Sequence, residues 1–206
     1  MSSMSTNDVV IESMLQALHL HGRLDAMLES EFRKHLDVIC SYLLHRQDTR
    51  LVPSLTVDAG RAKLLLVGLV KTDPPAHTRR FRLKLCRTLD ASVGPGDSGL
   101  ILAAVQSLDE DLVRFLIEKQ VTPCRKALCL AAEELHLGIV ELIVSRVPGV
   151  SQISALKTVL QSQPQLCLPI VRALLPYVLP EHIQFALEDA KRIDLCPQSV
   201  LAVLDV

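Results

Sequence analysis

Apolar residues recur every three to four positions in three stretches near the start of the chain. These stretches cover about residues 7–22, 24–45 and 58–70. Because an α-helix has 3.6 residues per turn, such spacing gathers the apolar side chains on one helical face. The pattern therefore predicts three amphipathic helices in this part of the sequence.

The segment 79–87 fits two patterns. Phe81, Leu83 and Leu85 alternate with basic residues, as they would in a half-buried strand. Phe81 and Leu85 also share one helical face with Leu89. We predict a helix, because the sequence offers no second convincing strand with which this segment could pair.

Three glycines within residues 94–99 mark a connection. No strand precedes them and no Lys-Ser or Lys-Thr follows them, so a phosphate-binding loop is excluded. We expect the chain to divide here into two regions. Residues 1–93 form an N-terminal helical region with a basic segment at 61–90, and residues 94–206 form a second region.

The second region repeats itself. Leu100-Ile-Leu-Ala-Ala104 recurs 28 residues later as Leu128-Cys-Leu-Ala-Ala132, and weaker matches follow at Leu156 and at residues 183–187. Each copy is followed by a second apolar run, and these runs begin at Leu112, Ile139, Ile170 and Val200. Repeats of this length are typical of helix pairs that stack, since a single pair cannot bury its own apolar face.

The alanine pairs favour this interpretation, because a small side chain lets another helix cross closely. We therefore predict an all-α fold of stacked helical hairpins with an N-terminal helical extension. The alternative is an ordinary helical bundle in which the repeat spacing is coincidental.

Residues 126–144 resemble an ankyrin repeat. The Leu-x-Leu-Ala-Ala core, His136 and the pair Ile139-Val140 fall at the spacing of that family. The segment departs from the family in two places. Lys126-Ala127 replaces the usual Thr-Pro pair, and Leu135 replaces the glycine of the turn before His136.

The resemblance extends over residues 98–206 and is strongest over 98–146. The first copy has one extra residue between Ala104 and Leu112 when it is aligned on the alanine pairs. The period is also shorter than the 33 or so residues that are usual for the family, which leaves little room for protruding hairpin loops.

The resemblance implies an ankyrin-like solenoid that binds a partner protein, often through a concave face, and it implies no catalytic residue. We therefore expect a non-enzymatic adaptor or scaffold whose partner the sequence does not identify. Residues 18–36 also bear a fainter similarity to LisH-type dimerisation motifs of centrosomal proteins.

Charge adds one alternative. The net charge is −1, but residues 61–90 hold eight basic and two acidic residues. This segment could bind a nucleic acid, another anionic ligand or an acidic protein surface, or it could be a solvated helical face. The pI of about 6.6 and the single aromatic residue within 79–87 argue against a dedicated nucleic-acid binder. The candidate binding residues are Arg79, Arg80, Arg82, Lys84 and Arg87.

Other chemistry is not indicated. The sequence contains no recognisable catalytic, cofactor-binding or metal-binding motif, and we expect no enzyme activity, cofactor or metal. We expect Asp109-Glu-Asp111 to cap a helix and His136 to have a structural role at a turn. Apolar residues form 49% of the chain, which excludes general disorder.

The cysteines and the N-terminus predict a location. The six cysteines form no Cys-x-x-Cys pair and mostly lie in leucine-rich stretches, which is typical of buried, reduced thiols. No run is long and apolar enough to span a membrane, and the N-terminus lacks the pattern of a secretory signal. We therefore expect an intracellular protein, cytoplasmic or nuclear.

Overall fold

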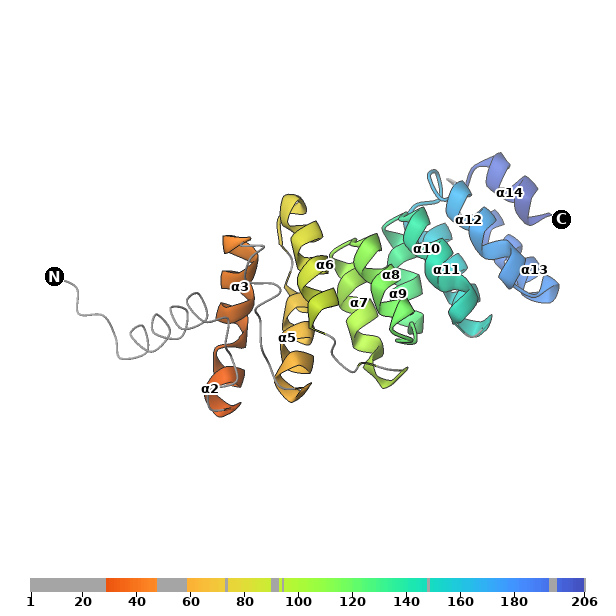
Figure 1. The fold of residues 1–206 in the computed structure, drawn as a ribbon. Coiled ribbons are helices and arrows are strands. Elements are labelled where there is room, and N and C mark those ends of the chain that lie inside the picture. The colour runs from red at the N-terminus through yellow and green to blue at the C-terminus, as the bar shows by residue number, and fades with distance from the viewer. Residues whose placement is uncertain are drawn as a thin grey trace. The chain divides into compact units, whose positions relative to one another are not determined.

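The protein is helical throughout the part that the structure describes, which confirms the all-α class (Figure 1). The computed structural model describes residues 29–47, 59–72, 74–89, 93, 95–147, 149–192 and 196–205. Within these ranges every α-helix is too short or too polar to cross a membrane. The helix predicted at 7–22 lies outside the described residues.

The chain divides into two compact units, Met1–Val93 and Gly94–Val206. In the first unit, α5 packs against the three other described α-helices. The α-helices of this unit are α2 (Glu29–Lys34), α3 (Leu36–Arg46), α5 (Ala59–Lys71) and α6 (Arg79–Thr88), with a 3₁₀ turn at Ala76–Thr78. The position of α5 agrees with the helix predicted at 58–70.

The helix predicted at 24–45 is divided in the structure. A break at His35 separates α2 from α3, and residues 24–28 lie outside the described part. The apolar face nevertheless continues across the break, because Phe32, His35 and Ile39 are all buried. The periodicity of apolar residues predicts which face of a helix is buried, but it does not predict a local change of backbone direction.

The basic segment is helical, so the strand alternative was wrong. Phe81, Leu85 and Leu89 are buried, whereas Leu83 is half-exposed. Burial therefore follows the helical spacing of four and not the alternation of a strand. The apolar face of α6 is what packs against α5.

The second unit consists of four helix pairs. A 3₁₀ turn at Pro95–Asp97 precedes them, and α7 begins at Ser98, inside the glycine-rich segment that we expected to be a connection. The pairs are α7 (Ser98–Gln106) with α8 (Glu110–Glu118), α9 (Arg125–Glu133) with α10 (Leu137–Ile143), α11 (Gly149–Ser162) with α12 (Leu168–Leu174), and α13 (Pro180–Lys191) with α14 (Gln198–Leu204). Short 3₁₀ turns follow α10 at Val144–Arg146 and α12 at Leu175–Tyr177.

The contacts between these helices follow a regular order. Each helix contacts its own partner within the pair. The first helices of successive pairs also contact one another, from α7 through α9 and α11 to α13. The second helices do the same, from α8 through α10 and α12 to α14.

The repeat has a register that differs from the one suggested by the alanine pairs. The buried residues of α9 are Ala127, Leu128, Ala131 and Ala132, and those of α7 are Leu100, Ile101, Ala104 and Val105. These sets are 27 positions apart, whereas the sequence match has an offset of 28. With the 27-residue offset, the apparent extra residue between Ala104 and Leu112 disappears. Ala103 and Ala131, which the alanine pairs align, differ in burial, because Ala103 is half-exposed and Ala131 is fully buried.

The last copy is shifted further. The first helix α11 buries Ala155, Leu156 and Val159, and α13 buries the equivalent residues Ala186, Leu187 and Ala190, 31 positions later. The sequence match had placed this copy at residues 183–187, one helical turn earlier. Residue similarity selected the wrong turn because Ile183 is apolar yet half-exposed.

The same 27-residue offset relates two turns within the first two pairs. Leu108 and Leu135 have φ angles of 48° and 54°, in the left-handed region that side chains normally avoid. The next residue in each turn caps the following helix. The Asp109 carboxylate accepts a hydrogen bond from the Leu112 N–H at 3.1 Å, and Nδ1 of His136 accepts one from the Ile139 N–H at 3.3 Å. The predicted capping role of Asp109 and the structural role of His136 are both confirmed.

Candidate interaction surfaces

Burial suppresses the ionisation of two of the described cysteines, Cys40 and Cys167. All six are free thiols, and Cys40, Cys86 and Cys167 are buried while the other three are half-buried. Burial, helped by the nearby Asp37 and Cys86, raises the pKa of the Cys40 thiol to about 12. Burial and the neighbouring Cys196 raise the pKa of Cys167 to about 11. Both thiols are thus held in the protonated form, which is the poor nucleophile.

Metal-binding chemistry finds equally little support among the described residues. No three His, Cys, Asp or Glu side chains of this part gather closely enough to hold a metal ion. Asp109 and His136, which carry the side-chain types of a metal site, are instead engaged in capping α8 and α10.

The basic segment places its five candidate residues in different environments. Arg82 is fully buried, and its guanidinium donates a hydrogen bond to the Thr72 carbonyl. It therefore holds the chain between α5 and α6 and does not present its charge at the surface. Arg79 is half-exposed, and the exposed cations are Arg80, Lys84 and Arg87.

These three exposed cations form a stripe on α6. Positions 80, 84 and 87 have the i, i+4, i+7 spacing of one helical face, and the half-exposed Leu83 lies on the same face. We call Arg80, Leu83, Lys84 and Arg87 the cationic stripe. Arg80 lies in the first turn of α6, which has no acidic residue. A cation at a helix N-terminus is unfavourable, because the unpaired N–H groups there carry a partial positive charge.

In the second unit, a half-exposed row follows the buried positions of the first helices. The row consists of Leu102 and Ala103 on α7, and Cys129 and Leu130 on α9. On the next two helices the row becomes polar, where Lys157 of α11 and Asp189 of α13 form an ion pair at 3.0 Å. The row is therefore apolar on α7 and α9 and charged on α11 and α13.

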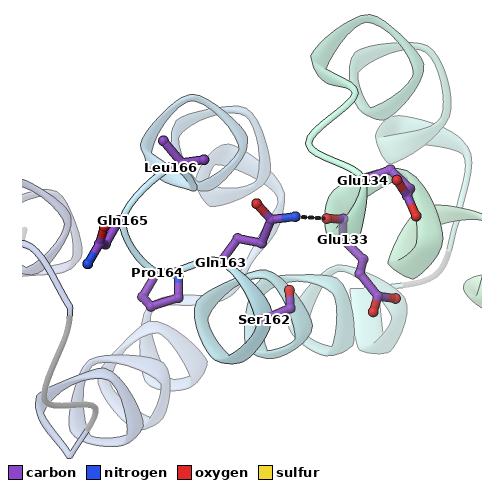
Figure 2. Close-up of a pocket in the computed structure, with 7 residues that line it drawn as sticks. All are labelled: Glu133, Glu134, Ser162, Gln163, Pro164, Gln165 and Leu166. Carbon is purple, nitrogen blue, oxygen red and sulfur yellow. Dashed lines mark hydrogen bonds between the residues drawn. The ribbon is translucent and has the colours of Figure 1, made fainter.

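A pocket of about 450 Å³ lies at the end of α9 and α11. Figure 2 shows its walls: one comes from the end of α9, and the other from the last residue of α11 and the turn that follows. Gln163 joins the walls, because its side-chain amide donates a hydrogen bond to the Glu133 carbonyl at 3.1 Å. The lining residues are Glu133, Glu134, Ser162, Gln163, Pro164, Gln165 and Leu166.

The charge of this pocket is unusual for its position. Helix C-termini carry a partial negative charge and normally favour Lys or Arg in their last turn. Neither α9 nor α11 has a basic residue there, and α9 ends in Glu133 with Glu134 next to it. Within the described residues neither carboxylate forms an ion pair. Two carboxylates and two helix C-termini thus make the pocket strongly electronegative.

The pocket also has an apolar wall. Leu166 is 65% exposed, the most exposed of the large apolar residues in the described part of the chain. The sequence does not single out this site, because two adjacent glutamates at a helix end are typical of a solvated helix edge. The pocket depends on a contact between residues 30 positions apart, for which the local sequence carries no signal.

Comparisons with known proteins identify no relative: no family model, no curated protein and no solved structure matches this chain.

Proposed function

We propose that the chain is a non-enzymatic adaptor or scaffold that binds a partner protein through an ankyrin-like solenoid formed by its second unit. The observation that carries this proposal is the repeated turn. Leu108-Asp109 and Leu135-His136 share the left-handed residue and the side-chain cap, at the same offset as the buried positions. The shared turn favours one geometry for the first two helix pairs, as stacked repeats require.

The order of helix contacts supports the same proposal. First helices contact first helices, and second helices contact second helices, along all four pairs. Such an arrangement gives an extended surface on which equivalent positions lie side by side, and repeat proteins use such surfaces for binding. The half-exposed apolar residues Leu102 and Leu130 lie on this surface and are the residues that we expect to contact a partner.

The experiment that tests the proposal compares two surfaces of the same unit. The purified 206-residue chain is used to capture proteins from a cell extract, followed by cross-linking and mass spectrometry. The double variant Leu102→Gln, Leu130→Gln should lose the captured partner. The variant Leu137→Gln alters an exposed leucine of the second helix α10, and it should retain the partner. If both variants retained the partner equally, the surface that contains Leu102 and Leu130 would be rejected as the binding site.

A second candidate function rests on the cationic stripe. Three exposed cations on one face of α6 could bind the phosphates of a nucleic acid or another anionic ligand. This alternative predicts a salt-sensitive affinity for single- or double-stranded nucleic acid. Replacing Arg80, Lys84 and Arg87 by glutamine should abolish that affinity, and the absence of binding at low salt would reject the alternative.

A further inference from the structure

We propose that the chain self-associates, with the cationic stripe of one copy bound in the acidic pocket of a second copy. The two surfaces are complementary in charge and in apolar character. The pocket carries Glu133 and Glu134 with the exposed Leu166, and the stripe carries three cations around Leu83. This contact is distinct from the partner-binding surface proposed above, and it involves no residue of that surface.

The electrostatics of each surface favour such a contact. Arg80 lies at the positive end of α6, and Glu133 lies at the negative end of α9. Both placements are unfavourable within a single chain, by the interaction of each charge with its own helix dipole. Binding of the stripe in the pocket compensates both unfavourable interactions, since Arg80 and Glu133 then each face a surface of the opposite charge.

Each of the two surfaces is small and built from few elements. The stripe spans residues 80–87 of one helix, and its first and last residues are roughly 10 Å apart along the helix axis. It therefore presents a short, single-helix ridge, and the pocket of about 450 Å³ is bounded by two helix ends and a turn. Leu83 is the residue of the stripe that would cover Leu166.

Within the described residues, no contact of the fold uses the charges of the stripe. Arg80, Lys84 and Arg87 form no ion pair within the described residues, and removing their charges takes away no described contact. The buried Arg82 shows the contrast on the same helix, because its guanidinium is used internally. The charges of the stripe are thus available to a second molecule.

The proposed contact joins two different surfaces, so it is heterologous. Each wild-type copy carries one stripe and one pocket, and can therefore bind two other copies. A variant that lacks one of the two surfaces can bind only one. This difference between the wild type and the variants can be measured. A nonspecific attraction between charges would not produce it.

Two neutralised variants are compared with the wild-type protein by sedimentation velocity. The pocket variant is Glu133→Gln, Glu134→Gln, and the stripe variant is Arg80→Gln, Lys84→Gln, Arg87→Gln. At low salt the wild-type mass should rise with concentration, and high salt should suppress the rise. Each variant alone should remain monomeric. An equimolar mixture should form a 1:1 complex and nothing larger, because only one stripe and one pocket are then intact.

The matched control neutralises another exposed pair in the same unit, with Glu110→Gln and Arg114→Gln on α8. This control should self-associate like the wild-type protein. A wild-type protein that stays monomeric at low salt up to its solubility limit would overturn the proposal, and so would a mixture that fails to form the 1:1 complex. If the stripe binds nucleic acid while the protein stays monomeric, the nucleic-acid alternative replaces self-association.

Discussion

A Cβ atom placed on Gly68 would lie 2.7 Å from Sγ of Cys40, closer than real Cβ contacts come. Helix α5 can therefore approach α3 at this point only because residue 68 has no side chain. The thiol of Cys40 fills the space, and it lies 3.9 Å from the Leu65 carbonyl oxygen as a weak hydrogen-bond donor. The approach of α5 to α3 at this point thus depends on one glycine and one cysteine.

We expect Gly68→Ala to destabilise the first unit. Overpacking costs about 1–3 kcal/mol, and the higher helix propensity of alanine offsets about 1 kcal/mol of this. Urea unfolding of the single and double variants measures the effect. Adding Cys40→Ala should recover part of the loss, with a coupling energy of at least about 0.5 kcal/mol between the two sites. Strictly additive changes in the free energy of unfolding would show that the contact between residue 68 and Cys40 does not limit the approach of α5 to α3.

Gly138→Ala provides the comparison, because it also adds one methyl group to a helix. The three atoms nearest to a Cβ at this position all belong to the carboxylate of Glu110, which is the end of a flexible side chain. The carboxylate can move away at little cost, since its ion pair with Arg114 is exposed and such pairs contribute about 0.2–1 kcal/mol. We therefore expect Gly138→Ala to leave stability unchanged or to raise it by up to about 1 kcal/mol.

The register of the repeat can be tested with one substitution at two positions. Aligned on sequence, Ala103 and Ala131 are equivalent, but Ala131 is fully buried and Ala103 is half-exposed. We expect Ala131→Leu to cost about 1–3 kcal/mol through overpacking. Ala103→Leu should change the free energy of unfolding by no more than about 0.5 kcal/mol. Equal losses at both positions would favour the 28-residue offset over the observed one.

The turn before α10 predicts an unusual order of stabilities at position 135. Leu135 has a φ of 54°, which costs a residue with a side chain about 1–2 kcal/mol and costs glycine almost nothing. We expect Leu135→Gly to be neutral or stabilising, after the loss of some contacts of the half-buried leucine. Leu135→Val should be less stable than the glycine variant by at least about 1 kcal/mol, because β-branching is poorly tolerated here. Thermal unfolding of both variants would decide the order.

The Cys40 thiol predicts a dependence of stability on pH. Its pKa is raised from an ordinary value of 9.0 to about 12, mainly by burial, so the thiol ionises in the unfolded chain before it ionises in the folded one. Its contribution is fully present below pH 9, and it is lost progressively as the pH rises from 9 towards 12. The loss should reach about 1.4 kcal/mol per pH unit in that window.

Denaturation in urea under reducing conditions, at pH 8 to 11, tests this dependence. The Cys40→Ala variant cannot ionise at this position, and its stability should fall less steeply with pH than that of the wild type. Other groups titrate in the same range, so the informative quantity is the difference between the two slopes. Parallel slopes would contradict a buried, protonated thiol at this position.

Much of the helical structure could be predicted because its determinants are local. The helix at 58–70, the helix through the basic segment and the capping role of Asp109 all follow from residues within one or two turns of each other. The second apolar runs were also placed well, since the buried residues of α8, α10, α12 and α14 recur at the predicted spacings. Periodicity and capping act over a few residues, and the sequence displays them directly.

The sites depend on contacts that a single stretch of sequence does not contain. The charge of Arg82 looks the same in the sequence as that of Arg80, yet its side chain turns inward to the Thr72 carbonyl. Likewise, Glu133 and Glu134 read as a polar helix edge until the turn after α11 is placed beside them. The pocket exists because two segments 30 residues apart share one hydrogen bond.

By itself, the sequence determined the helical class, most helix positions and the existence of a repeat, because helix formation responds to neighbours three and four residues away. Tertiary structure alone decided the 27-residue register, the inward turn of Arg82, the approach of α5 to α3 at Gly68 and the acidic pocket. Those features follow from which helix faces meet across the core, and many residues of similar hydrophobicity could have met there. Only the packed arrangement selects among them.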